Sequence, residues 1–127
     1  MDERKQAGIE GKVLILDDDP EQRFRYSYHL RNGGYHPIEA GNVDEAKEYL
    51  LTHLPRICIV DYRMPNKKST EPFCRYVKEN MPHIPIIMIS GKDRDKTLFD
   101  LFFMKPIDKA GLLRLVKEAT ERKRNSE

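Results

Sequence analysis

Four short runs of apolar residues constrain the fold of this chain more than any other feature of its sequence. They are residues 13–16 (VLIL), 57–60 (ICIV), 84–89 (IPIIMI) and 101–104 (LFFM). Each run is too short for a helix in the core and holds no charged residue, which is typical of a strand buried on both faces. A weaker fifth strand is predicted over residues 36–39, between two glycine-containing segments.

Segments with helix signals separate these strands. The first opens at Asp19-Pro20, an N-cap followed by proline at the first helical position, and Gln22 is placed to close a capping box. The second begins after Asn42, Ser69-Thr70 can cap a third, and the last starts near Asp108. Alternating strands and helices predict an α/β fold with a parallel sheet, right-handed crossovers and helices on both faces.

The composition fits one soluble domain. A length of 127 residues, with 39% hydrophobic and 35% charged residues, is enough to build a core. The net charge is only +2, so we expect no nucleic-acid partner. No apolar run approaches the roughly 20 residues that span a bilayer, and the polar opening is unlike a signal peptide, which favours a cytoplasmic protein without a membrane partner.

The two ends of the chain are polar, and they suggest its domain boundaries. We expect a flexible N-terminal arm over residues 1–11, one domain over residues 12–120 and a C-terminal tail over residues 121–127. Cys58 and Cys74 fit neither a disulfide framework nor a zinc site, so both are predicted to be buried free thiols.

Polar side chains follow the predicted strands at the points where they end. Asp17-Asp18-Asp19 follows the first strand, and later strands are followed by Asp61, Ser90-Gly91 and Lys105-Pro106. Because the carboxyl ends of parallel strands meet at one edge of a sheet, we expect these groups to lie together. Clustered carboxylates need a cation, and oxygen ligands of this kind suit Mg²⁺. The serine hydroxyl and the lysine ammonium suit a phosphoryl group beside it.

Four motifs in this order resemble the receiver domain of bacterial response regulators, the phosphoaccepting component of two-component signalling. They are LILDDDP at residues 14–20, VDYRMP at residues 60–65, ISG at residues 89–91 and MKP at residues 104–106. The resemblance covers residues 12–120. It implies a doubly wound, five-stranded parallel sheet of the flavodoxin or CheY-like class, with strand order 2-1-3-4-5.

The same resemblance implies roles for the acidic residues. Asp61 is the expected phosphoacceptor, which takes a phosphoryl group from a phosphohistidine on a sensor histidine kinase or a histidine phosphotransfer protein and forms an acyl phosphate. Asp18 and Asp61 are expected to bind Mg²⁺ directly and Asp17 mainly through water. The backbone carbonyl of Arg63 is the further expected ligand. Asp19 is interpreted only as a helix cap.

Three further residues carry expectations from the resemblance. Ser90 and Lys105 would hold the phosphoryl oxygens, and Phe102 stands where the family keeps an aromatic switch coupled to movement of Ser90. Plainer interpretations stay open: a lysine before proline is often a surface residue, and Phe102 needs no reason beyond core packing. The acidic residues likewise have the alternative of a solvated turn.

The chain departs from the family pattern between Ser90 and Lys105. The interval holds 14 residues, four of them in the last strand, so ten remain for a crossover that generally needs about a dozen. We therefore predict a fourth helix that is truncated or absent. The sheet near Phe102 and Phe103 would be partly uncovered, a surface for a downstream protein target or for self-association.

A second departure concerns basic residues near the acceptor. Ser69 stands where the family usually has glycine, beside Lys67-Lys68. Arg63 and Lys92 lie two residues beyond Asp61 and Ser90, at positions that tune access of the hydrolytic water in this family. We expect exchanges of these two cations to alter the lifetime of the phosphate.

The sequence favours a phosphoacceptor of a two-component or phosphorelay system that signals through protein contacts. Such a domain is not an enzyme beyond its own phosphoryl transfer and autodephosphorylation. No output domain is expected after the last helix, although excision from a hybrid kinase or longer regulator would give the same residues. The alternative is a pseudo-receiver, a constitutive interaction module that is not phosphorylated. A third class is a magnesium-dependent phosphatase, whose acceptor follows the first strand and has a second aspartate two residues on. Asp17 and Asp19 have that spacing, but the four motifs place the acceptor at Asp61, so this class is less well supported.

Overall fold

The computed structural model describes residues 11–64, 68–90, 99–104 and 107–126. Five parallel strands form one sheet in the order β2-β1-β3-β6-β7. They are β1 (Lys12–Leu16), β2 (His36–Ala40), β3 (Ile57–Asp61), β6 (Ile86–Ser90) and β7 (Leu101–Met104). Counting only these five, the order is 2-1-3-4-5, so the predicted fold class and all five strands are confirmed.

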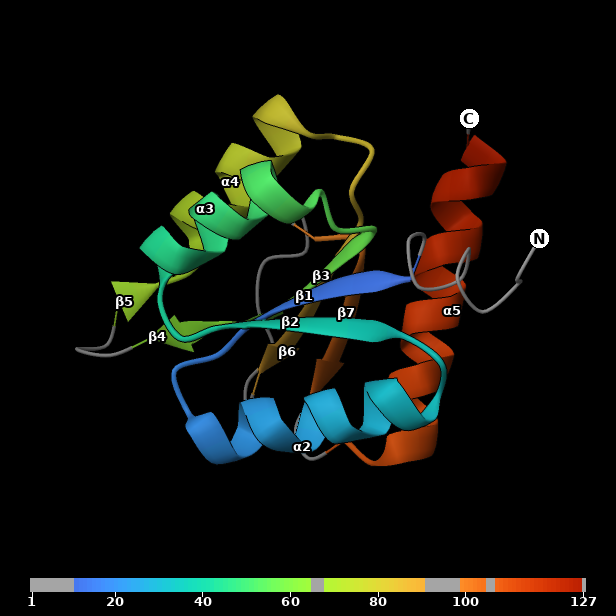
Figure 1. Ribbon diagram of the computed structural model, residues 1–127. Coiled ribbons are helices and arrows are strands. Elements are labelled where there is room, and N and C mark those ends of the chain that lie inside the picture. Colours follow the sequence, from blue (N-terminus) through green and yellow to red (C-terminus); the bar gives the residue numbers. More distant parts are fainter. Residues whose placement is uncertain (1–10, 65–67, 91–98, 105–106, 127) are drawn as a thin grey trace.

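Helices cover both faces of the sheet, as Figure 1 shows. On one face lie α3 (Val43–His53) and α4 (Glu71–Asn80), and on the other lie α2 (Pro20–Asn32) and α5 (Lys109–Ser126). A short antiparallel pair, β4 (Arg63–Met64) and β5 (Lys68–Ser69), follows β3 and was not predicted from the sequence. In the described part of the chain, no helix is long and apolar enough to cross a membrane.

The strands bury alternate residues in two separate cores, as expected for a doubly covered sheet. The core under α3 and α4 takes Leu14, Leu16, Cys58, Val60, Ile86 and Met88. The core under α2 and α5 takes Val13, Ile15, Ile57, Ile59, Ile87 and Ile89. Cys58 and Cys74 are buried free thiols, as predicted.

The predicted helix caps are confirmed at the first two helices. Asp19 accepts a hydrogen bond from the Glu21 N–H, and Asn42 accepts one from the Glu45 N–H. The capping box predicted for Gln22 is wrong, because its side chain donates to the Tyr26 hydroxyl one turn later. A side chain that packs along the helix in this way is not available to the helix terminus.

The crossover from β6 to β7 spans residues 91–100. Residues 91–98, where the truncated fourth helix was predicted, lie outside the described residues. Phe99 and Asp100 are described and are not helical. The Asp100 N–H donates to the Ile86 carbonyl, and its carboxylate accepts from the Ile86 N–H, each over 2.8 Å. Asp100 therefore fixes the start of β7 against the start of β6.

Phe99 packs into the core under α3 and α4. It is buried, and its ring centroid lies 5.4 Å from that of Phe102, which is itself half-buried. An aromatic side chain thus covers part of the face that was expected to lie open near Phe102. Phe103 is half-buried and packs against the opposite core.

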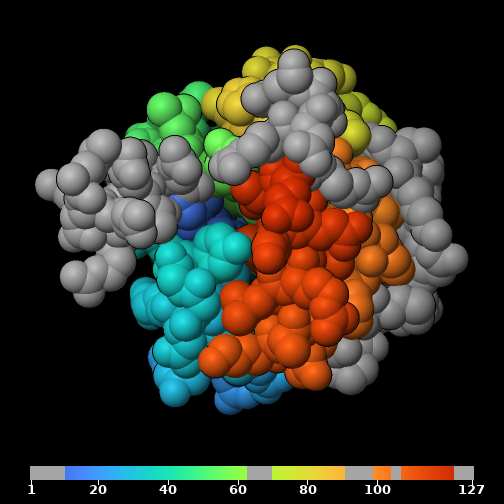
Figure 2. Space-filling model, turned by 90° about the vertical axis from the view of Figure 1, so that its right-hand side faces the viewer, coloured from blue at the N-terminus to red at the C-terminus, as the bar shows by residue number. Residues whose placement is uncertain are grey.

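Helix α5 packs beside α2 on the same face of the sheet. Figure 2 shows it lying between β7 and the C-terminal end of α2. The approach to α2 is close, because a Cβ atom built on Gly33 would lie 2.6 Å from Leu113 Cδ2. The helix continues to Ser126 and so includes residues 121–126 of the predicted C-terminal tail.

Candidate metal and phosphoryl site

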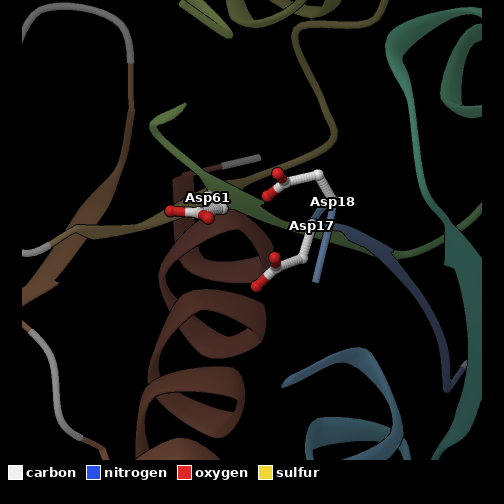
Figure 3. Close-up of side chains that lie close together, drawn as sticks. All are labelled: Asp17, Asp18 and Asp61. Atoms are coloured by element: carbon white, nitrogen blue, oxygen red, sulfur yellow. The ribbon is translucent and has the colours of Figure 1, made fainter. Parts of the chain in front are cut away.

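The carboxylates of Asp17, Asp18 and Asp61 come together at the carboxyl ends of β1 and β3. Leu16 and Val60 are direct partners in neighbouring parallel strands, so the residues that follow them reach the same level of the sheet. Each of the three side chains offers one oxygen within 4.8 Å of the others. Figure 3 shows the three groups side by side. The convergence predicted from the strand ends is therefore present.

Burial differs among the three carboxylates. Asp17 is only 1% exposed, Asp61 is half-buried and Asp18 is exposed. An ion or reactant therefore has access from the side of Asp18 and Asp61, while Asp17 forms the floor. A buried carboxylate beside two others is unfavourable without compensating charge, which favours a cation here.

Hydrogen bonds to and from nearby elements hold residues 17–19, which we call the acid loop. Asp17 Oδ1 accepts from the Asp19 N–H over 2.9 Å, and the Asp17 N–H donates to the Ala40 carbonyl. Arg23, on the first turns of α2, donates to the Asp17 carbonyl oxygen over 2.7 Å. Its Nε lies 3.5 Å from Glu39 Oε1 at the end of β2. The acid loop is thus held by β2 and by α2.

The acceptor loop, residues 62–70, connects Asp61 to α4. The Tyr62 N–H donates to the Ile89 carbonyl over 3.3 Å, which continues the pairing of β3 with β6. The Tyr62 hydroxyl and Glu71 Oε1 are hydrogen bonded over 3.2 Å. The Thr70 hydroxyl lies 2.8 Å from the Asp61 carbonyl oxygen and 3.0 Å from that of Tyr62. The backbone beside Asp61 is therefore tied to the start of α4.

The β4–β5 pairing bears on Arg63, whose carbonyl is the predicted metal ligand. Arg63 lies opposite Ser69, and the flanking Thr70 N–H donates to the Tyr62 carbonyl over 3.0 Å. Hydrogen-bonded and non-hydrogen-bonded pairs alternate along an antiparallel ladder. This pairing therefore does not use the Arg63 carbonyl oxygen, which is compatible with the predicted role.

The remaining predicted site residues are only partly within the described chain. Ser90 ends β6, is buried, and follows Ile89, the direct strand partner of Asp61. It therefore lies at the expected edge, one position beyond the acceptor's partner. Lys105 and Lys92 lie outside the described residues, so their predicted roles cannot be placed. Phe102 packs against Phe99, as its plainer interpretation requires.

Tyr26 is a residue near the site that sequence reasoning missed. It lies on α2 and is buried against the sheet. Burial, and then the negative charges of Asp17 and Asp61, raise the pKa of its hydroxyl well above the ordinary value. The phenol therefore stays protonated beside the carboxylates. Helical spacing could have placed Tyr26 on the buried face, but no sequence signal indicates where its hydroxyl lies.

The donor set fits a hard divalent cation. All three converging groups are carboxylates, the ligand type that Mg²⁺ prefers, and within the described residues they are the only such cluster. Both cysteines lie in the core under α3 and α4 and supply no thiolate here, because burial raises their pKa values strongly. The expected Mg²⁺ is thus chemically compatible with the residues that are present.

A sequence profile of the response regulator receiver domain matches residues 13–117. This chain therefore belongs to the response regulator receiver domain family. The match begins within β1 and ends within α5, so it includes all five strands of the sheet.

Curated relatives include longer regulators and one short protein. Response regulator protein PilR from Pseudomonas aeruginosa is 32% identical over 124 residues, covering 91% of this chain and 27% of PilR. Heme response regulator HssR from Staphylococcus saprophyticus is 32% identical, covering 86% and 51%. An uncharacterized 14.6 kDa protein from Leptolyngbya boryana is 30% identical, covering 84% and 87%. The chain spans 36% and 35% of the PhoP regulators from Escherichia coli and Bacillus subtilis.

Solved structures show the same fold. A response regulator receiver domain protein from Clostridium thermocellum has a TM-score of 0.83 at 21% identity, covering 92% of this chain and 99% of that chain. The receiver domain of NtrC4, solved as a beryllofluoride-activated dimer, has a TM-score of 0.80 at 27% identity, with coverage of 89% and 98%. The likeness to the Clostridium thermocellum protein, at 21% identity, shows the fold alone.

Proposed function

We propose that this domain accepts a phosphoryl group on Asp61 and passes the signal on through protein contacts. The observation that carries the proposal is the meeting of three carboxylates, two from the acid loop and one from the half-buried Asp61 at the end of the central strand β3. A nucleophile needs access on one side and a fixed backbone on the other, and Asp61 has both.

The proposed donor is a phosphohistidine on a sensor histidine kinase or a histidine phosphotransfer protein. A carboxylate oxygen of Asp61 attacks the phosphorus, the P–N bond breaks, and the imidazole leaves with its electron pair. The product is an acyl phosphate on Asp61. Mg²⁺, when bound, neutralises negative charge on the phosphoryl oxygens. Ser90 and Lys105 are proposed to hold those oxygens.

The three carboxylates suit different roles toward the ion. Asp18 and Asp61 have accessible carboxylates, which suits direct ligation. Asp17 Oδ1 already accepts the Asp19 N–H, which favours contact through water for this group. The Arg63 carbonyl is proposed as a further ligand, since the β4–β5 pairing does not use it.

A protein donor needs a surface beside the acceptor, and the aromatic face of α2 offers one. We define this face by Phe24 and Tyr28, which are 65% and 56% exposed and whose rings stack at 6.5 Å. Together with Pro20, Glu21 and Arg25 they line a shallow depression at the start of α2. This helix begins directly after the acid loop, so a partner that delivers a phosphohistidine to Asp61 would contact it.

Intact mass spectrometry tests the proposal directly. The protein is incubated with acetyl phosphate, with and without Mg²⁺, and compared with Asp61→Asn and Asp44→Asn. Asp44 is an exposed aspartate in the first turn of α3 and is not one of the three clustered carboxylates, so it serves as the matched control. The expected result is one phosphoryl adduct on wild type and on Asp44→Asn, only with Mg²⁺, and none on Asp61→Asn.

Two other outcomes would overturn the proposal. No adduct on wild type, from acetyl phosphate or from any phosphohistidine protein tested, would favour the pseudo-receiver. Hydrolysis of a phosphomonoester that is lost in Asp17→Asn but kept in Asp61→Asn would favour the phosphatase.

A further inference from the structure

Thr70 is fully buried at the junction of the acceptor loop and α4. Its hydroxyl lies 2.8 Å from the Asp61 carbonyl oxygen and 3.0 Å from the Tyr62 carbonyl oxygen. Its N–H also donates to the Tyr62 carbonyl over 3.0 Å. One residue thus holds two consecutive carbonyl groups at the end of β3.

The direction of these hydrogen bonds is unusual for a residue at this position. Thr70 is the N-cap residue of α4, where a threonine hydroxyl ordinarily accepts from an N–H in the first turn. Here the side chain makes no capping hydrogen bond, and Pro72 has no N–H to offer at the second helical position. The capping role predicted for this side chain is therefore wrong, and the hydroxyl serves the strand instead.

The two carbonyl groups control the parts of the chain that the proposed chemistry needs. The Asp61 carbonyl belongs to the peptide unit that follows the acceptor, so holding it limits rotation of the backbone that carries the carboxylate. The Tyr62 carbonyl belongs to the peptide unit that leads into Arg63, whose own carbonyl is the proposed metal ligand. Both the nucleophile and that ligand are thus oriented by Thr70: its hydroxyl serves the nearer Asp61 carbonyl, and its N–H serves the Tyr62 carbonyl.

We infer that Thr70 is a positioning residue for phosphoryl transfer, acting through the backbone of Asp61 and Tyr62. This inference rests on the proposed function. The hydroxyl holds the backbone of the acceptor in the geometry that Mg²⁺ and the incoming phosphoryl group require. Because a misplacement of about 1 Å can slow a reaction strongly, losing this restraint slows transfer in a protein that is still folded.

The test compares Thr70→Val with two matched variants. Thr70→Ser keeps the hydroxyl and serves as the rescue. Thr120→Val is the control, because the Thr120 hydroxyl donates over 2.8 Å to the Val116 carbonyl within α5, away from the site. Thr70→Ala removes the same hydroxyl without adding a methyl group, and replaces Thr70→Val if that variant does not fold.

Two measurements are made at a temperature where every variant is folded. The first is the rate of phosphorylation by acetyl phosphate at saturating Mg²⁺, and the second is Mg²⁺ affinity by calorimetry. For Thr70→Val we expect a rate about tenfold lower and Mg²⁺ binding several-fold weaker, since tenfold corresponds to about 1.4 kcal/mol, near the net value of one hydrogen bond. Thr70→Ser should stay within about twofold of wild type, and Thr120→Val should lose stability only.

Equal rates and equal Mg²⁺ affinities for Thr70→Val and Thr120→Val would overturn the inference, while phosphorylation of wild type on Asp61 would leave the proposed function standing. If wild type is not phosphorylated at all, the proposed function fails separately. In that case unchanged Mg²⁺ affinity in Thr70→Val overturns the inference as well. Failure of Thr70→Ser to restore the rate would also count against a role for the hydroxyl.

Discussion

The acid loop and the acceptor loop bring carboxylates to the same point but are held in different ways. The acid loop is three residues long. Apart from the bond between the Asp17 N–H and the Ala40 carbonyl, its hydrogen bonds involve Asp19 and Arg23, which are near in sequence. The acceptor loop spans nine residues and is held at its far end by Thr70. A local restraint is built as α2 forms, whereas the distant one needs α4 to be packed.

This difference separates two kinds of contribution to one site. The acid loop supplies charge for a cation, and it depends on the start of α2 and the end of β2 being in place. The acceptor loop follows the nucleophile Asp61, which ends β3, and the orientation of Asp61 depends on contacts between β3 and the start of α4. We therefore expect changes in the acid loop to act through metal affinity or local stability, and changes in the acceptor loop to act on transfer itself.

The largest expected effect comes from exchanging one carboxylate in each region. Asp61→Asn removes the nucleophile and should abolish the adduct at any Mg²⁺ concentration. Asp18→Asn removes one negative charge beside the ion and should weaken Mg²⁺ binding at least about tenfold, with the adduct restored at high Mg²⁺. Calorimetry and intact mass measure the two effects. Loss of the adduct in Asp18→Asn at saturating Mg²⁺ would contradict the division between the loops.

The elements around the acceptor loop should also lose stability at alkaline pH. Burial raises the pKa of Cys74 on α4 to about 12, against 9.0 for a free thiol, and raises that of Cys58 on β3 further. Above pH 9 the unfolded chain therefore loses protons that the native state keeps, and stability falls by about 1.4 kcal/mol per pH unit for each group. Urea unfolding between pH 7 and 10.5 measures the decline.

A matched variant checks the cause of that decline. Cys74→Ala removes one of the two thiols and should make the loss of stability above pH 9 less steep, although it lowers stability at neutral pH by leaving a cavity. An unchanged slope would assign the alkaline decline to other groups, such as Tyr26, whose pKa is also raised.

The aromatic face of α2 allows a sharper separation of docking from chemistry. The double variant Phe24→Ala, Tyr28→Ala should reduce transfer from a phosphohistidine protein about tenfold, since exposed aromatic anchors often contribute more than 1 kcal/mol to an interface. Phosphorylation by acetyl phosphate should be unchanged, because that donor needs no docking surface. Leu51→Ala, an exposed apolar residue on α3, is the control. Equal losses with both donors would mean that the variant disturbs the acid loop.

The smallest expected effect concerns the cap that follows the acid loop. Asp19→Ala removes the side chain that accepts from the Glu21 N–H and should lower stability by about 1 kcal/mol. Asn42→Ala removes the corresponding cap of α3, which does not follow the acid loop, and should have a similar cost. Thermal unfolding compares the two. A much larger cost for Asp19→Ala would show that the acid loop depends on its cap more than its other hydrogen bonds suggest.

The acid loop and its surroundings could largely be predicted from the sequence. Strands and caps such as Asp19 and Asn42 follow from patterns within a few residues, and the structure confirms them. The meeting of Asp17, Asp18 and Asp61 was predictable because parallel strands share one carboxyl edge. These features need only the identity of neighbouring residues and the rule for the sheet.

Features that depend on packing were not predictable in the same way. Thr70 carries the sequence signature of a cap, and only the position of β3 shows that its hydroxyl serves the strand. Gln22 matches a capping box, but its side chain finds the Tyr26 hydroxyl instead. The short β4–β5 pair is too small for a periodic signal. At Thr70 a contact with β3 decides between two local possibilities, whereas at Gln22 a partner one turn away in α2 does so.

The shortened crossover is an intermediate case. Its length follows from the sequence, and the structure adds that Phe99 is buried and packs against Phe102. The expected open surface is reduced there, since Phe99 and Phe102 pack together. Self-association or target binding through β7 and this crossover remains a proposal, and light scattering in both phosphorylation states would test its self-association part.

The most direct test of the account is to locate the phosphoryl group within the chain. The protein is treated with acetyl phosphate and Mg²⁺ and then with borohydride, which reduces an aspartyl phosphate to homoserine, and peptides are sequenced by mass spectrometry. If Asp61 is the phosphoacceptor, we expect homoserine at position 61 and unmodified aspartate at positions 17 and 18. Homoserine at position 17 or 18, or at no position in protein that has been exposed to active donors, would contradict it.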